Sequence, residues 1–159
     1  MGILLFAIET SIRQAVLADA EIIAQFNVAL ARESEALELE ADCVRPGVEA
    51  LLRDPAKGTY FVAVSAGEVV GQLLITHEWS DWRNGDFWWL QSVYVRADFR
   101  RRGIFRALFD FVQAKAAASR DVCGLRLYME QDNARAREAY WRLGMEETHY
   151  RVFERNIRK

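Results

Sequence analysis

Three stretches rich in β-branched and aromatic residues follow one another in the middle of the chain, at residues 59–65, 69–79 and 87–95. This composition, bounded by turn residues, predicts β-strands. A tight connection at residues 66–68 separates the first two stretches, and Asn84-Gly85 before the third is a strong turn signal. We therefore expect the three stretches to form an antiparallel meander.

Apolar residues at helical spacing predict helices on both sides of the meander. Helices are expected after Asp19, over residues 46–52 with Pro46 near the first turn, from Gly103, and from Asn133 to Gly144. Further strands are expected at residues 11–16 and 125–130, with one or two more within residues 145–155. This order of elements is typical of an α/β domain with a mixed sheet.

The length of 159 residues suits one domain with a substantial core. We find no repeat, linker or low-complexity segment. The sequence therefore predicts a single domain over residues 11–159. Residues 1–10 are expected to be an extension or an extra strand, too short to span a bilayer.

The composition of the chain mainly argues against large anionic partners. With 21 Lys and Arg against 23 Asp and Glu, the net charge is −2, which predicts neither a nucleic-acid nor a membrane partner. Arginines cluster instead at residues 96–106 and 135–142, which suits a small anionic ligand. Cys43 and Cys123 lack metal-ligand spacing. We expect no metal, and two reduced, buried thiols in a cytoplasmic protein.

The main candidate for a ligand site follows the predicted strand at residues 87–95. There the chain continues into Arg100-Arg101-Arg102-Gly103 and then into an apolar helix. A helix N-terminus offers unpaired N–H groups and partial positive charge. Glycine allows an anion to approach the backbone, and arginine binds phosphate through charge-assisted hydrogen bonds. The unit is either a phosphate site or a basic surface turn before a core helix.

A second motif favours the phosphate site. Asn133 is followed by Tyr140 and then by Gly144-Met145. Together the two motifs resemble the GCN5-related N-acetyltransferase (GNAT) family, whose acetyl-CoA loop follows [Gln/Arg]-x-x-Gly-x-[Gly/Ala]. Residues 100–105 match this pattern except at Phe105, a bulky residue at the position of glycine or alanine. We expect Phe105 to share a helix face with Phe109 and to leave the backbone amides accessible.

The resemblance implies a GNAT-like fold, with a mixed, mostly antiparallel sheet flanked by helices, and acetyl-CoA as co-substrate. Nothing in the sequence resembles a nucleophilic triad, which predicts direct attack by a primary amine in a ternary complex. Homodimers are common in families of this kind, so a homodimer is a further expectation. The strand before the loop and the loop itself would bind the cofactor, together with the second motif. The implied cofactor-binding residues are Val93, Tyr94, Val95, Arg100, Arg101, Arg102, Gly103, Ile104, Phe105, Arg106, Asn133 and Tyr140. Tyr140 would also protonate the departing thiolate.

The general base is left open by the sequence. Glu78 is the first choice, and Asp81, Asp86, Glu33, a water chain and a neutral amine are alternatives. The acceptor is a small-molecule or peptide amine. Acidic residues within 33–42 slightly favour a small cationic amine, although the same residues suit a solvated helix end. The alternative functions are a non-catalytic acyl-CoA binding or sensing module and, with less support, a nucleic-acid binder.

Overall fold

The computed structural model describes residues 10–157 of the chain. The chain forms two compact units, one ending at Tyr128 and one beginning at Met129. The expected extension over residues 1–10 lies outside the described residues except for Thr10, which starts the first strand. A single domain over residues 11–159 stays a prediction, and each unit is described by itself.

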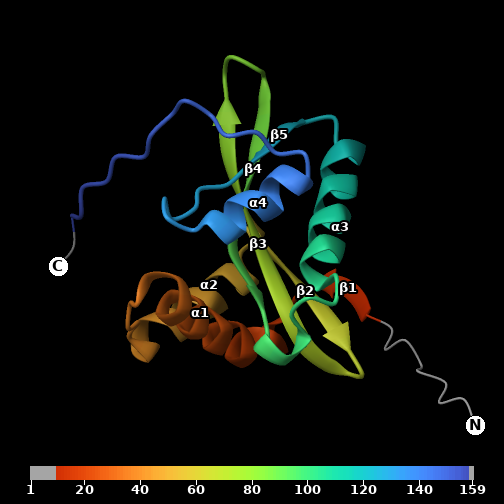
Figure 1. Cartoon of the computed structure of the whole chain (residues 1–159), viewed down its shortest axis with the longest axis vertical. Coiled ribbons are helices and arrows are strands. Elements are labelled where there is room, and N and C mark those ends of the chain that lie inside the picture. Colours follow the sequence, from red (N-terminus) through yellow and green to blue (C-terminus); the bar gives the residue numbers. More distant parts are fainter. Residues whose placement is uncertain (1–9, 158–159) are drawn as a thin grey trace, which may run out of the picture. The chain divides into compact units, whose positions relative to one another are not determined.

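A five-stranded sheet forms the centre of the first unit, and its strands lie in chain order, β1-β2-β3-β4-β5 (Figure 1). Neighbouring strands from β1 to β4 are antiparallel, whereas β4 and β5 are parallel. The predicted mixed, mostly antiparallel sheet is thus confirmed. The strands are β1 Thr10–Gln14, β2 Thr59–Ser65, β3 Glu68–Ser80, β4 Gly85–Val95 and β5 Val122–Arg126.

Three helices of the first unit cover the two faces of this sheet: α1 Ala20–Glu35, α2 Ala41–Arg53 and α3 Ile104–Ala118. Successive residues of a strand point to opposite faces. Tyr60 belongs to the buried cluster that contains residues of α1 and α2. The ring of Phe61, its neighbour, lies 5.4 Å from the ring of Phe111 in α3. The sheet therefore separates α1 and α2 from α3.

The helix predicted over residues 46–52 begins five residues earlier, at Ala41, so Pro46 lies inside α2. Proline lacks the N–H that a residue beyond the first turn donates to the fourth preceding carbonyl. Pro46 is only two residues beyond the first four helical positions. Pro46 therefore removes one backbone hydrogen bond near the start of α2. Apolar residues farther along, such as the buried Val48, still pack the helix against the protein.

The strand predicted at residues 125–130 lies earlier, at Val122–Arg126. The strands expected within residues 145–155 do not form in the part of the chain that the structure describes. A strand needs a neighbouring strand to pair its backbone groups. The described residues of the second unit contain no strand. Its one regular element there is α4, Ala134–Arg142.

Both cysteines were expected to be buried, and both are exposed free thiols. Cys43 lies in the first turn of α2 and Cys123 lies on β5, at the edge of the sheet. No helix within residues 10–157 is both long and apolar enough to cross a membrane.

Candidate functional site

The loop between β4 and α3 presents a helix N-terminus to open space. Arg101 and Gly103 have left-handed backbone conformations, with φ of 64° and 79°, and Gly103 is the N-cap of α3. A Cβ added to Gly103 would meet no atom within 4 Å. First-turn N–H groups have no partner inside a helix and carry partial positive charge. The loop therefore has the geometry of an anion site.

The four arginines around this N-terminus have different partners. Arg106 pairs with Asp110 one turn along α3. Arg100 turns back: its Nε donates to the Val95 carbonyl at 2.8 Å, and its Nη2 donates to Glu33 of α1 at 2.6 Å. Arg101 and Arg102 are exposed and form no ion pair with another described residue, although Arg102 lies 5.0 Å from the ring centre of Phe99. These two arginines are thus available to an anion.

Phe105 lies in the first turn of α3 and is half-buried. Its ring centre is 6.4 Å from that of Phe109, a buried residue of the same helix. Ile104 beside it is also buried. The aromatic ring thus lies against the helix face that packs on the protein, as the sequence predicted, while Arg106 is exposed.

β4 has one free backbone edge toward the loop. The parallel pairing with β5 covers only Asp86–Trp89 among the described residues, whereas pairing with β3 continues to Val95. A bulge interrupts the β3–β4 register between Gln72 and Leu74, and on the β4 side Ser92 has a positive φ of 48°. The edge of β4 that contains Val93, Tyr94 and Val95 can therefore pair with an extended ligand.

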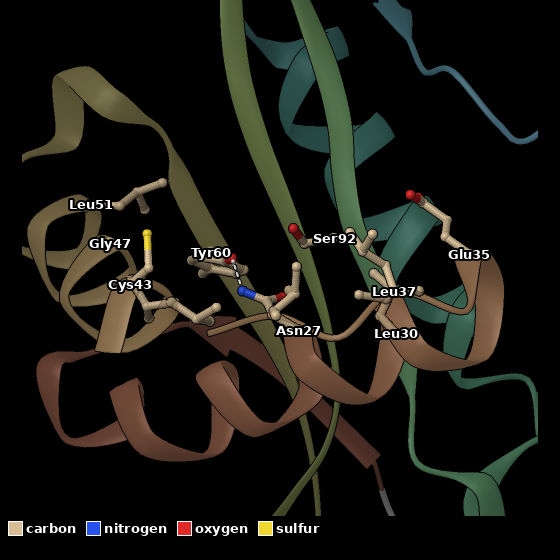
Figure 2. Close-up of a pocket in the computed structure, with 13 residues that line it drawn as sticks. Asn27, Leu30, Glu35, Leu37, Cys43, Gly47, Leu51, Tyr60 and Ser92 are labelled. Atoms are coloured by element: carbon tan, nitrogen blue, oxygen red, sulfur yellow. Dashed lines mark hydrogen bonds between the residues drawn. The ribbon is translucent and has the colours of Figure 1, made fainter. Parts of the chain in front are cut away.

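A pocket of about 390 Å³ opens on the opposite face from α3, between α1, α2 and the sheet (Figure 2). Apolar side chains supply most of its lining. Figure 2 shows Cys43, Gly47 and Leu51 at one end, and Leu37 with Glu35 at the other. The apolar lining residues are Leu30, Ala31, Leu37, Leu39, Val44, Val48 and Leu51.

Polar groups gather in the middle of the pocket and form a buried network. Asn27 donates from Nδ2 to the Tyr60 hydroxyl at 3.0 Å and accepts from Gln72 Nε2 at 2.7 Å. The same Gln72 nitrogen donates to the Ser92 carbonyl at 3.1 Å, and Gln72 is fully buried. The network thus ties α1 to the bulge of β4, because a buried amide holds its partners in place.

Two tyrosines of this region have raised pKa values. Burial raises the pKa of Tyr60, opposed by its hydrogen bonds with Asn27 and Ser92. Burial also raises the pKa of Tyr94, whose hydroxyl donates to Glu33 at 3.1 Å. Both phenols therefore stay protonated at neutral pH. The Tyr94 hydroxyl donates to Glu33, whereas the Tyr60 hydroxyl accepts from Asn27.

Glu78, the predicted base, lies elsewhere on the sheet. One carboxylate oxygen accepts from Trp89 Nε1 at 2.5 Å and the other from Arg126 Nη1 at 2.9 Å. Glu78 pairs with Phe87 in the β3–β4 register. Ser92 is five residues further along β4, so Glu78 is roughly 16 Å from it, at about 3.3 Å per residue. The structure does not bring Glu78 to the pocket.

In the second unit, Asn133 is the N-cap of α4, and its Oδ1 accepts from the Ala136 N–H at 3.0 Å. Tyr140 lies on the same helix, and burial raises the pKa of its phenol. Gly144 has a φ of 80°, and the Met145 N–H donates to the Tyr140 carbonyl. This pattern is a Schellman cap, and it confirms Gly144 as the residue that ends the helix.

The structure thus brings together the β4 edge, the loop and the start of α3 within the first unit, while Asn133 and Tyr140 share the second. Sequence reasoning missed the network of Asn27, Tyr60, Gln72 and Ser92. Its signal was present: Asn27 interrupts an apolar helix stripe and Gln72 an apolar strand, and buried polar residues are the informative exceptions. The described residues contain no group of three His, Cys, Asp or Glu that could hold a metal.

Residues 21–145 match the model of the acetyltransferase (GNAT) family. The chain is also 43% identical to a possible acetyltransferase from Clostridium difficile 630, with a TM-score of 0.89. That match covers 94% of this chain and 99% of the other. No curated protein matches the chain.

More distant solved structures share the fold. A ribosomal-protein-alanine N-acetyltransferase from Brucella melitensis biovar Abortus 2308 is 21% identical, over 94% of this chain and 100% of that one, with a TM-score of 0.74. The aminoglycoside N-acetyltransferase AAC(6')-Iy in complex with CoA is 18% identical, over 98% and 99%, with a TM-score of 0.77.

Proposed function

The chain belongs to the acetyltransferase (GNAT) family, and we propose that it transfers the acetyl group of acetyl-CoA to a small primary amine by direct attack in a ternary complex. The family makes the protein an acetyl-CoA-dependent N-acetyltransferase. The acceptor, the mode of attack and the residue roles are the content of the proposal.

The observation that carries the proposal is that the open edge of β4 leads, through one loop, directly to the N-terminus of α3. An extended pantetheine arm suits the β4 edge at Val93, Tyr94 and Val95, which β5 does not pair among the described residues. The Val95 carbonyl there already accepts from Arg100. A pyrophosphate suits the N–H groups from Gly103 to Arg106, with Arg101 and Arg102 free to neutralise its charge. Arg100 contributes by tying the loop to Glu33.

The reaction needs three groups. The amine nitrogen uses its lone pair to form a bond to the thioester carbonyl carbon, and the carbon–sulfur bond breaks. A backbone N–H of the open β4 edge would stabilise the oxyanion that develops. The thiolate takes a proton from the Tyr140 phenol, which its raised pKa keeps protonated. The amine nitrogen loses its proton to a chain of water molecules, which would need to span the roughly 16 Å between Ser92 and Glu78 if Glu78 is the final acceptor.

The acceptor is assigned to the pocket between α1 and α2. Ser92 connects the two parts, because it lines the pocket and lies at the bulge of the β4 edge. Holding the amine and the thioester side by side is itself a large part of the catalysis. The pocket volume of about 390 Å³ is at the low end of the range for small-molecule sites, about 300–1,000 Å³, which favours a small amine over a protein amine.

A non-catalytic acyl-CoA binding module is the second candidate, and one observation favours it: both oxygens of Glu78 already accept hydrogen bonds. The deciding experiment measures CoA-thiol release from acetyl-CoA with a panel of amines, for the wild type and for Tyr140→Phe. Amine-dependent release that falls in the variant supports the transferase. Binding of acetyl-CoA without amine-dependent release would support the binding module.

We further propose a cytoplasmic location and a homodimer. Two exposed free thiols suit a reducing compartment, and the dimer rests on the family resemblance alone. Light scattering coupled to size-exclusion chromatography tests the dimer, and a monomeric mass at micromolar concentration contradicts it.

A further inference from the structure

The pocket between α1 and α2 indicates which amines the protein acetylates. We infer that the acceptor is a primary amine with one apolar group, branched-alkyl or arylalkyl, which the pocket binds between α1 and α2. This inference rests on the proposed function and narrows it, because most small cationic amines do not meet this description.

The acidic stretch before α2 does not line the pocket with negative charge. Glu33 binds Arg100 and Tyr94, and Glu38 binds Arg32 through two hydrogen bonds of 2.8 Å. Of the acidic residues within 33–42, only Glu35 lines the pocket. The several ammonium groups of a polycationic acceptor would therefore meet a single carboxylate, at the end of the pocket that Glu35 lines.

The rest of the lining is suited to burial of hydrocarbon. Six leucine and valine side chains line the pocket, and Val48 among them is buried in the core cluster of α1 and α2. Burial of apolar surface stabilises a complex. A charged group of the ligand placed against the same surface would lose its hydrating water and gain no polar partner in exchange. The lining thus selects for an apolar group and against a second charge.

The position of the polar groups orients such an amine. Asn27, Tyr60 and Ser92 lie at the middle of the pocket in Figure 2, between the α2 end at Leu51 and the end at Glu35. A ligand whose hydrocarbon fills the end at Leu51 has its nitrogen near Ser92, beside the bulge of β4. An apolar body with one polar head fits this order of groups.

Gly47 provides a substitution that fills the pocket without straining the helix. It lines the pocket from α2, and a Cβ added there would meet no atom within 4 Å. Replacing a helical glycine raises helix propensity, so Gly47→Leu is expected to fold. Ala50→Leu, at an exposed position of the same helix that does not line the pocket, is the matched control.

Cys43 provides a readout independent of catalysis, because it is an exposed thiol in the pocket lining. The experiment uses the full chain carrying Cys123→Ser and measures the rate at which a small thiol reagent modifies Cys43, without acetyl-CoA. Isopentylamine and 2-phenylethylamine are the probes, and spermidine is the polycationic comparison. At a concentration of about four times its Kd, a bound amine slows modification about fivefold by mass action.

We expect both apolar amines to protect Cys43 and spermidine to give no protection. Gly47→Leu should raise the Kd of each apolar amine at least about tenfold, because it overpacks the site. At the same amine concentration, protection would then fall from about fivefold to about 1.4-fold, and Ala50→Leu should leave it unchanged. Equal or better protection by spermidine, no protection by either apolar amine, or unchanged protection in Gly47→Leu would each overturn the inference.

Acetyl-CoA binding, measured separately by calorimetry, distinguishes this inference from the proposed function. If the wild type does not bind acetyl-CoA, the proposed function is wrong. Protection of Cys43 would in that case still show whether the pocket binds an apolar amine. Normal acetyl-CoA binding without protection would count against the apolar acceptor alone.

Discussion

Glu33 and Arg100 are 67 residues apart in the chain, and their carboxylate and guanidinium meet at 2.6 Å. Glu33 is at the end of α1, beside the pocket wall, and Arg100 is in the loop before α3. The same carboxylate accepts from Tyr94 of β4, and the same guanidinium holds the Val95 carbonyl. The two residues thus join the side of the sheet proposed to bind the acceptor to the proposed cofactor loop.

Glu33→Gln should therefore lower kcat/KM for acetyl-CoA while it changes stability little. An ion pair at this level of exposure contributes less than about 1 kcal/mol to the free energy of unfolding, but its loss releases Arg100 from α1. Steady-state kinetics and urea unfolding give the two quantities. Glu38→Gln is the control, since it breaks the similar exposed pair with Arg32 away from the loop. Equal kinetic effects of both variants would contradict the coupling.

The double variant Arg101→Ala, Arg102→Ala should raise the Kd of acetyl-CoA about tenfold or more, because each charge-assisted hydrogen bond contributes about 1.5–3 kcal/mol and tenfold is about 1.4 kcal/mol. Calorimetric titration at low and high salt measures the loss, which salt should diminish. Arg106→Ala, whose partner is Asp110, should have a smaller effect. If the double variant binds acetyl-CoA with the Kd of the wild type, neither arginine contributes to the cofactor site.

Tyr140→Phe should lower kcat by about a hundredfold, the lower bound for loss of a general acid. Because burial raises the pKa of Tyr140, the acid stays protonated beyond its ordinary value of about 10. The rate of the wild type should rise with pH as the amine deprotonates and should not fall below that value. A pH–rate profile with an alkaline decline near neutrality would exclude Tyr140 as the acid.

Glu78→Gln tests the base. If Glu78 accepts the proton, kcat falls and the acid limb of the pH–rate profile disappears. If the amine binds neutral, the profile follows the pKa of the amine in both proteins. Comparing two amines of different pKa distinguishes these outcomes. Thermal unfolding of the variant controls for the lost hydrogen bonds to Trp89 and Arg126.

Asp19→Asn should destabilise the fold by about 1–3 kcal/mol at pH 7, since the buried carboxylate accepts two hydrogen bonds from Arg13 and one from the Val16 N–H. The hydrogen bonds from Arg13 hold the pKa of Asp19 below its usual range. A lowered pKa adds stability above the unfolded value of about 3.9, and this is lost as pH falls through the folded pKa.

The difference between wild type and Asp19→Asn should therefore shrink as pH falls from 5 to about 2. Urea unfolding at several pH values measures it. Asp98→Asn, which removes an exposed partner of Arg96, should cost less. A pH-independent difference would mean that Asp19 acts through packing and not through its charge.

Local signals predicted those element ends that a cap or a glycine marks, but not the starts of α2 and β5. They did not predict pairing between residues far apart in the chain. Gly103, Asn133 and Gly144 mark helix ends because backbone conformation and capping depend on neighbouring residues. Asn27 and Gln72 are 45 residues apart, and their pairing depends on a packing of α1 against β3 that neither segment encodes alone. For the same reason apolar content at residues 145–155 wrongly predicted strands: it says nothing about whether a partner lies alongside.

The order of the strands in the sheet has a consequence for how the protein folds. β2, β3 and β4 are joined by short turns and pair with their chain neighbours, so their contacts close small loops, which form fast. Tyr60, Gln72 and Ser92 lie on these three strands. We expect this meander to assemble early and α1 to dock on it later. The strand side of the pocket would then form before α1 and α2 supply its apolar lining, and Val62→Ala should slow folding more than Val48→Ala does.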